Sequence, residues 1–223
     1  MRFLILIGSL FLLTAFSTSE PQGFSDEKYH SYTWQSFRRL PQARDTLDLY
    51  DPDYELLGAA IFYMTNQARA KKGLAPLRFD PRLRDAALLH SGQMAHDHFV
   101  DHYHPRSKKY RSPADRAKLV GADLAAENVA SSFLYRYRSN THYYPRTVSG
   151  KRQFYTSSGQ LIVRHTYLGF AERIVRNWLE SPGHRRNILH RDLKRLGCAV
   201  RYGEGEVASG QMPLAYSTQN FGY

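Results

Sequence analysis

The stretch NWLESPGHRRNIL, residues 177–189, decides how the C-terminal half of this chain folds. Before it, apolar residues recur every three or four positions from about Tyr167 to Glu180, as in an amphipathic helix. Ser181 and Pro182 then match the cap and the first position of a new helix. We therefore expect one helix to end here and a short second helix to carry residues 184–189.

His184 falls in the first turn of this predicted short helix. The positive end of the helix dipole disfavours a charged imidazolium, so the ring keeps a neutral nitrogen for a metal ion or a hydrogen bond. A surface loop has no need of a histidine at this point. We therefore examine His184 as a candidate site residue.

Three further helices have clear start or stop signals. One is expected from about Tyr54 to Lys72, where Gly73 supplies the stop. Another begins with Asp80 as cap and Pro81 in the first position, and a third has Ser112 as cap and ends at Gly121. These signals place helices on both sides of the chain's midpoint.

The C-terminal quarter has the alternating pattern of strands. LGCAVRY and PLAYSTQNFGY alternate apolar and polar residues, and GEGE between them indicates a turn. Helices and strands are mixed without a regular βαβ repeat, which predicts a layered α+β domain. Cys198, the only cysteine, lies on the apolar side of its strand, so we expect a buried thiol and no internal disulfide.

Composition and targeting signals suggest an exported protein with one folded domain. Of the 223 residues, 42% are hydrophobic and 13% aromatic, which is typical of a globular chain. Residues 1–19 have the pattern of a secretory signal peptide, and their apolar run is shorter than a membrane span needs. We expect a secreted or periplasmic protein without an integral span after cleavage. An N-terminal arm, residues 20–53, then leads into a body formed by residues 54–223.

The formal net charge of +11 predicts attraction to anionic surfaces. Lysine and arginine are scattered along the chain without a nucleic-acid motif, so we expect no nucleic-acid partner. Lipid, wall polymer and envelope protein are the partners that suit an exported basic protein, which we expect to be a monomer.

An insert, residues 131–166, is rich in tyrosine and arginine. RQFYT and LIVRH flank SSGQ, which predicts a β-hairpin. The insert could supply an apolar and cationic contact surface, or its tyrosines could pack the hairpin against the domain. The residues in question are Tyr135, Arg136, Tyr137, Tyr143, Tyr144 and Arg152.

Five of the ten histidines fall within residues 90–104. A metal-binding tract is one interpretation. His90, however, lies on the inward stripe of its helix and suits a hydrogen-bonded core position. His96, His98 and His104 suit solvated positions near the helix end, which leaves His102 to be considered.

Several motifs occur together in an order that resembles the CAP superfamily, which joins cysteine-rich secretory proteins, antigen 5 and pathogenesis-related proteins. They are NQARAKKGLAPLRFDPRLRDAALLHSGQMA, HYHP, AENVA, NWLESPGHRRNIL, LGCAV and YSTQNFG. SPGHRRNIL is the most specific of them. The resemblance covers about residues 54–223 apart from the insert. Among the family members, the exported bacterial ones have the most similar motifs.

The resemblance implies a three-layer α/β/α sandwich with a central antiparallel sheet and a wide cleft lined by two histidines and two acids. His102 and His184 match the histidines, and Glu127 of AENVA matches the first acid. At the position of the second acid this chain has Ser181, and nearby Glu180 and Glu172 are imperfect substitutes.

Two imidazoles and one carboxylate suit Zn²⁺ or another divalent metal with an open position. They equally suit a hydrogen-bonded structural cluster, and the sequence leaves both alternatives open. The resemblance favours a non-catalytic extracellular or envelope binding module for a lipid or other ligand. The alternative is a metal-dependent hydrolase, such as a protease, with Glu127 as the base on a metal-bound water.

Overall fold

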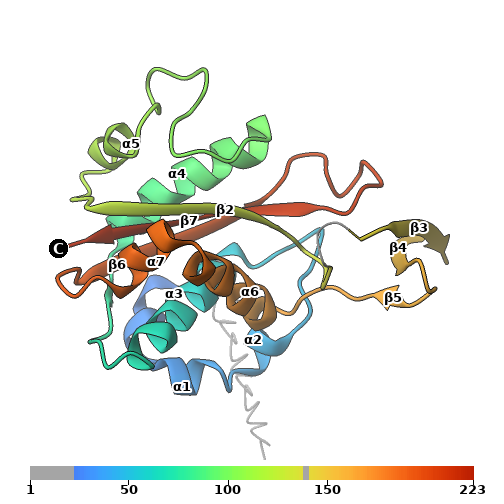
Figure 1. The fold of residues 1–223 in the computed structure, drawn as a ribbon, viewed down its shortest axis with the longest axis horizontal. Helices are drawn as coiled ribbons and strands as arrows, with labels where there is room; N and C mark the ends of the chain where they lie inside the picture. Colours follow the sequence, from blue (N-terminus) through green and yellow to red (C-terminus); the bar gives the residue numbers. More distant parts are fainter. Residues whose placement is uncertain (1–22, 138–140) are drawn as a thin grey trace, which may run out of the picture.

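The computed structural model describes residues 23–137 and 141–223 (Figure 1). The predicted signal peptide, residues 1–19, lies outside the described residues. The elements in chain order are η1 (Asp26–His30), α1 (Trp34–Phe37), α2 (Pro41–Arg44), α3 (Tyr54–Ala70), β1 (Arg78–Phe79), α4 (Pro81–Asp97), α5 (Pro113–Leu119), β2 (Ala126–Phe133), β3 (Tyr143–Val148), β4 (Lys151–Thr156), β5 (Leu161–Ile162), α6 (Tyr167–Glu180), α7 (Pro182–Leu189), β6 (Arg195–Tyr202) and β7 (Leu214–Gly222).

The body is a three-layer α/β/α sandwich, which confirms the predicted α+β fold class. Its central sheet has the order β1-β6-β7-β2. Helices α4 and α5 lie on one face, and α3, α6 and α7 lie on the other (Figure 1). The sheet is antiparallel from β6 to β2, but the two-residue strand β1 pairs with β6 in parallel. The predicted antiparallel sheet is therefore correct except at this edge.

Two glycines let helices approach β6 closely from both faces. A Cβ atom on Gly197 would lie 2.0 Å from the backbone nitrogen of Arg84 in α4. A Cβ atom on Gly58, in α3, would lie 2.8 Å from the carbonyl oxygen of Cys198. The Cys198 thiol is buried in this region, as its place on the apolar side of the strand predicted.

The helix boundaries follow the predicted capping signals. Helix α6 spans the predicted residues, and its buried Trp178 donates a hydrogen bond from Nε1 to the carbonyl oxygen of Val129 in β2. Asp80 and Ser112 accept backbone hydrogen bonds at the starts of α4 and α5. Ser181 differs from them, because it joins α6 to α7 without a side-chain capping bond. Pro182 at the first position starts α7.

The predicted N-terminal arm is not extended in its described part. From residue 23 to residue 53 it forms η1, α1 and α2, and it buries Phe24, Phe37 and Leu47. The rings of Phe37 and Tyr63 of α3 stack with centroids 4.3 Å apart. Burial of these aromatic side chains against α3 explains why short helical turns form without a long period in the sequence.

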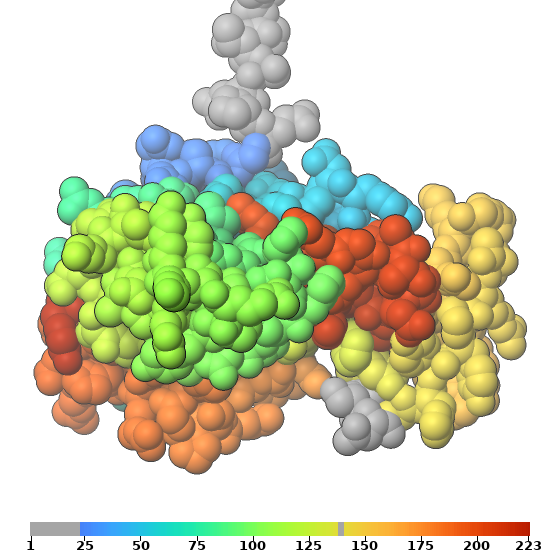
Figure 2. All heavy atoms as spheres, turned by 90° about the horizontal axis from the view of Figure 1, so that it is seen from above, coloured from blue at the N-terminus to red at the C-terminus, as the bar shows by residue number. Residues whose placement is uncertain are grey.

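The insert forms a separate sheet of order β3-β4-β5. The predicted hairpin is present, since β4 pairs with β5, but β3 adds a strand that we did not predict. This sheet projects at one end of the molecule, beside the loop that joins β6 and β7 (Figure 2). The Tyr143 hydroxyl donates a hydrogen bond to Gln211 of that loop over 3.0 Å. Within residues 23–137 and 141–223, no helix has the length and hydropathy needed to span a bilayer.

Candidate functional site

The candidate site lies at the edge of the central sheet, where β2 begins. Glu127 and Asn128 are successive residues of β2, so their side chains point to opposite faces of the sheet. Glu127 meets α4, α5 and the loop after α4, whereas Asn128 meets α7. The edge strand thereby connects the two helical layers.

Glu127 is the buried centre of the site. Arg116 of α5 donates from Nη2 to both carboxylate oxygens, over 3.1 Å to Oε1 and 2.9 Å to Oε2. Both side chains are almost fully buried, and the same Arg116 atom also donates to the carbonyl oxygen of His102. A buried pair of opposite charges with this geometry holds the loop after α4 onto β2.

His102 is fixed by the same carboxylate. Its Nδ1 donates to Oε1 of Glu127 over 2.9 Å, and its side chain is 40% exposed. The hydrogen bond to Glu127 raises the pKa of His102 despite a counteracting effect of burial. With Nδ1 engaged, Nε2 is the nitrogen that faces away from Glu127 and can meet a ligand.

His184 approaches from the opposite helical layer. The His102 and His184 ring centroids lie 6.4 Å apart with an interplanar angle of 55°. Asn128 donates from Nδ2 to the carbonyl oxygen of His184 over 3.2 Å, and Asn187 donates to Oδ1 of Asn128 over 2.9 Å. These amide contacts fix α7 on β2 and hold His184 in place.

Burial lowers the pKa of His184, and the charge of His102 adds to the effect. The two histidines therefore differ in protonation: Glu127 favours the charged form of His102, whereas burial favours the neutral form of His184. A neutral imidazole is the form that binds a metal ion or accepts a hydrogen bond.

His90 lies behind the site as a core residue. It is completely buried, and its Nε2 lies 2.8 Å from the carbonyl oxygen of Asp101 and 3.9 Å from Oε1 of Glu127. Burial lowers the pKa of His90 to about 4. The predicted hydrogen-bonded core histidine is confirmed.

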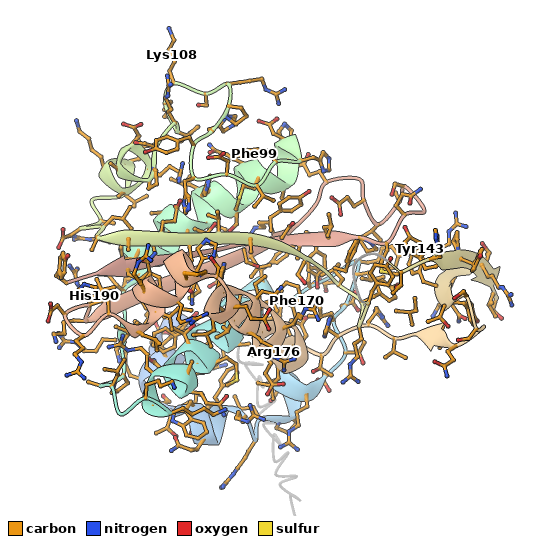
Figure 3. The ribbon with its side chains drawn as sticks, in the orientation of Figure 1. Phe99, Lys108, Tyr143, Phe170, Arg176 and His190 are labelled. Carbon is orange, nitrogen blue, oxygen red and sulfur yellow. The ribbon has the colours of Figure 1, made fainter. Side chains whose placement is uncertain are left out.

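The other histidines of this tract have carboxylate partners. His96 lies 2.6 Å from Glu204, and His98 lies 3.3 Å from Glu206. His104 is buried with Nε2 3.0 Å from Asp97, so its predicted solvated position is wrong. The aromatic ring of Phe99, which is labelled in Figure 3, lies 5.0 Å from the His104 ring between centroids.

Three side chains were considered from the sequence as the fourth residue of the site: Glu172, Glu180 and Ser181. Glu172 lies on the other side of α6 and pairs with Arg38 at 2.5 Å. Glu180 is exposed, and Ser181 forms the junction of α6 and α7. In the described part of the chain, none of these three has a hydrogen bond or ion pair to His102 or His184. Sequence reasoning missed Arg116, Asn128 and Asn187, whose roles depend on contacts distant along the chain.

The Glu127 carboxylate is not positioned as a third metal ligand beside the two histidines. Across residues 23–137 and 141–223, no group of three or more His, Cys, Asp or Glu side chains is arranged to hold a metal ion. Both oxygens of Glu127 are engaged by Arg116, and one of them also by His102. The two imidazoles thus remain as the candidate ligands, with Glu127 orienting one of them.

Of the six insert residues that the sequence suggested as a contact surface, three tyrosines pack against other aromatic side chains instead. The Tyr135 and Tyr143 rings meet Phe154 edge to face, with centroids 4.9 and 5.5 Å away. Tyr137 packs on Phe133 and on Tyr143 (Figure 3). These tyrosines attach the insert to the domain, whereas the exposed residues of the set are Arg136, Tyr144 and Arg152.

Comparisons with known proteins place this geometry in a family context. The CAP profile, the cysteine-rich secretory protein family, matches residues 62–221. The uncharacterized protein YkwD of Bacillus subtilis (strain 168) is 29% identical over 136 residues, 60% of this chain and 38% of that protein. The uncharacterized membrane protein YlbC of the same strain is 30% identical over 163 residues, 72% of this chain and 33% of that protein.

The chain thus spans well under half the length of these two relatives. Among solved structures, an extracellular protein containing a SCP domain from Bacillus anthracis str. Ames aligns with a TM-score of 0.49 and 17% identity. That alignment covers 77% of this chain and 42% of the other.

Proposed function

The chain belongs to the CAP family, the cysteine-rich secretory protein family, and from this premise we propose that it is a binding module outside the cytoplasm whose ligand site is formed by His102 and His184. The signal-peptide pattern of residues 1–19 supports export to the cell exterior or envelope. A lipid, a wall polymer or an envelope protein would be met there.

The observation that carries this proposal is the convergence of two imidazoles from opposite helical layers. The ring centroids are 6.4 Å apart, so one small ligand can contact both rings. A purely structural cluster would be expected to satisfy both rings internally. Instead, His102 keeps 40% of its side chain exposed while its partner Glu127 is buried.

We infer that a divalent metal ion is one candidate ligand of this histidine pair. His102 and His184 would hold the ion through ring nitrogens, and Glu127 would orient His102 without binding the metal itself. Zn²⁺ in such a site would supply open coordination positions for a carbonyl, carboxylate or phosphate oxygen of the ligand. The depressed pKa of His184 keeps its nitrogen available at neutral pH.

The geometry favours binding over hydrolysis. A general base must be able to accept a proton from an attacking water. Glu127 instead accepts hydrogen bonds from Arg116 on both oxygens and from His102 on one. Its carboxylate is therefore committed to holding the site together.

Calorimetric titration of the purified protein with Zn²⁺ at pH 7.5 tests the proposal. We expect stoichiometric binding that weakens at least about tenfold in His102→Ala and in His184→Ala. The matched control is His190→Ala, because His190 is an exposed histidine just beyond α7 (Figure 3). Circular dichroism of each variant checks that the fold is retained.

Equal loss of binding in His190→Ala would show that Zn²⁺ binds to surface histidines in general. Absence of binding in the unmodified protein would overturn the metal site and leave the histidine pair as a hydrogen-bonding site. Proteolysis or ester cleavage that requires Zn²⁺ and Glu127 would favour the hydrolase instead.

A further inference from the structure

A concave site apart from the histidine pair lies along the N-terminal half of α6 and the residues that precede it. Its cavity of about 550 Å³ is lined by residues of three separate segments. We call it the arginine cleft and define it by its charged lining: Arg38, Arg136, Arg164, Arg173, Arg176 and Glu172. Arg176 is seen on α6 in Figure 3. The insert contributes two of the arginines, so the cleft depends on the part of the chain outside the family motifs.

The arginine cleft has a large excess of positive charge. Glu172 pairs with Arg38 at 2.5 Å. Within the described residues, the other four arginines of the cleft form no salt bridge with a carboxylate; Arg164 donates only to the carbonyl oxygen of Leu47. Like charges held around one concavity repel each other and focus a positive potential there.

Two other arginines that are largely shielded from solvent lie against several carboxylates. Arg84 contacts Asp26, Glu55 and Asp85, and Arg195 contacts Asp80 and Asp123. Each of these arginines is neutralised by at least two acids. The arginine cleft differs from these two sites, because its five arginines share one carboxylate, that of Glu172.

Two further features beside the arginine cleft are consistent with a positive electrostatic potential there. Burial, followed by the charges of Arg136 and Arg173, lowers the pKa of His165 to about 4. Helix α6 also begins here, with Thr166 as its cap, so the positive end of a 14-residue helix dipole adds to the guanidinium charges. Both observations agree with a site shaped for negative charge.

We propose that the arginine cleft binds the phosphate group of an extracellular anion. Planar guanidinium groups bind phosphate oxygens in a bidentate manner, and several arginines around one concavity suit a group that carries charge on several oxygens. The cavity is open enough for a substituted phosphate, and the aromatic ring of Tyr137 and the side chain of Leu168 give its wall apolar contacts.

The arginine cleft is distinct from the histidine pair. Its lining on α6 extends to Arg176 and shares no residue with the site of His102, Glu127 and His184. The two sites can therefore be tested independently, and each can fail without the other.

Titration with inorganic pyrophosphate, followed by amide shifts in ¹H–¹⁵N NMR spectra, tests this site. We expect shifts centred on Gly169 and Arg136, and binding at least about tenfold weaker in Arg136→Ala/Arg173→Ala. Arg111→Ala/Lys118→Ala is the matched control, since it removes two exposed charges near α5 and changes the net charge equally. It should bind within about twofold of the unmodified protein, and Zn²⁺ binding should be unchanged in both double variants.

A vesicle arm identifies the source of the phosphate. Sedimentation with phosphatidylglycerol vesicles that fails only in the cleft variant assigns the site to a lipid headgroup. Pyrophosphate binding without vesicle binding assigns it to a soluble or polymer-borne phosphate. Equal weakening in the two double variants would overturn the proposal. So would the absence of pyrophosphate binding at 50 mM salt, where the Debye length is longer than about 10 Å and screening is weak.

Discussion

The Nδ1 atom of His102 lies 2.9 Å from Oε1 of Glu127, in a carboxylate that also accepts two hydrogen bonds from Arg116. One buried acid therefore performs two tasks: it neutralises a buried guanidinium, and it sets the orientation of a partly exposed imidazole. The two tasks can be separated by substitution, because they depend on different partners.

Glu127→Gln should lower the pKa of His102. The carboxylate raises that pKa by accepting the Nδ1 hydrogen bond and by its charge, and glutamine removes the charge while keeping the shape. The stabilisation from this pair is present when His102 is protonated and is lost as the pH rises through its folded pKa. NMR titration of the ring protons measures the change; an unchanged midpoint would contradict the assigned hydrogen bond.

Arg116→Met should destabilise the fold by about 3–5 kcal/mol, because it leaves the buried Glu127 carboxylate without its guanidinium. Urea unfolding measures this loss. In Arg116→Met/Glu127→Gln the uncompensated charge is absent, so the double variant should be more stable than Arg116→Met alone. A double variant whose loss equals the sum of the single losses would show that the two side chains do not interact.

Gly197→Ala should destabilise the protein by at least about 1–3 kcal/mol, because the added methyl group would overlap the backbone of α4. Gly92→Ala is the control within α4, since nothing lies within 4 Å of its added Cβ atom. Alanine there should stabilise the helix by about 0.5–1 kcal/mol. Thermal unfolding of the two variants compares them, and similar shifts of both would argue against close packing of α4 on β6.

Local signals in the sequence were sufficient for helices α3 to α7, but they did not predict η1, α1 and α2. The bounds of α6 match the prediction because Thr166 caps it and a continuous apolar stripe defines its length. Strand β1 was not predicted, because two residues pair only through the distant β6. Strand β3 is similar: its side chains are mostly exposed, so no alternating burial pattern distinguishes it from a loop.

The histidine site was predictable only in part, because it too depends on contacts between residues that are distant along the chain. Sequence resemblance identified His102, Glu127 and His184, which the structure brings to one edge of the sheet. The role of Glu127 depends on Arg116, a charged residue whose burial cannot be read from its position in a short helix. The arginine cleft likewise assembles from three segments, so scattered arginines in the sequence gave only an expected attraction to anions.

The stability of the protein should fall as the pH decreases from 6.5 to about 4, partly through His165. Its pKa is lowered to about 4 in the folded state, so the unfolded chain binds a proton first in this interval. The contribution of His165 to the free energy of unfolding is complete above its unfolded-state pKa and is lost as the pH falls toward its folded-state pKa. Its size is about 1–3 kcal/mol for a partly buried ring.

Urea unfolding at pH 7 and pH 4.5 should show a smaller loss in His165→Gln than in the unmodified protein. Since His90 titrates in both proteins, only the difference between them reports on His165, and identical losses would mean that this imidazole is freely protonated beside Arg136 and Arg173.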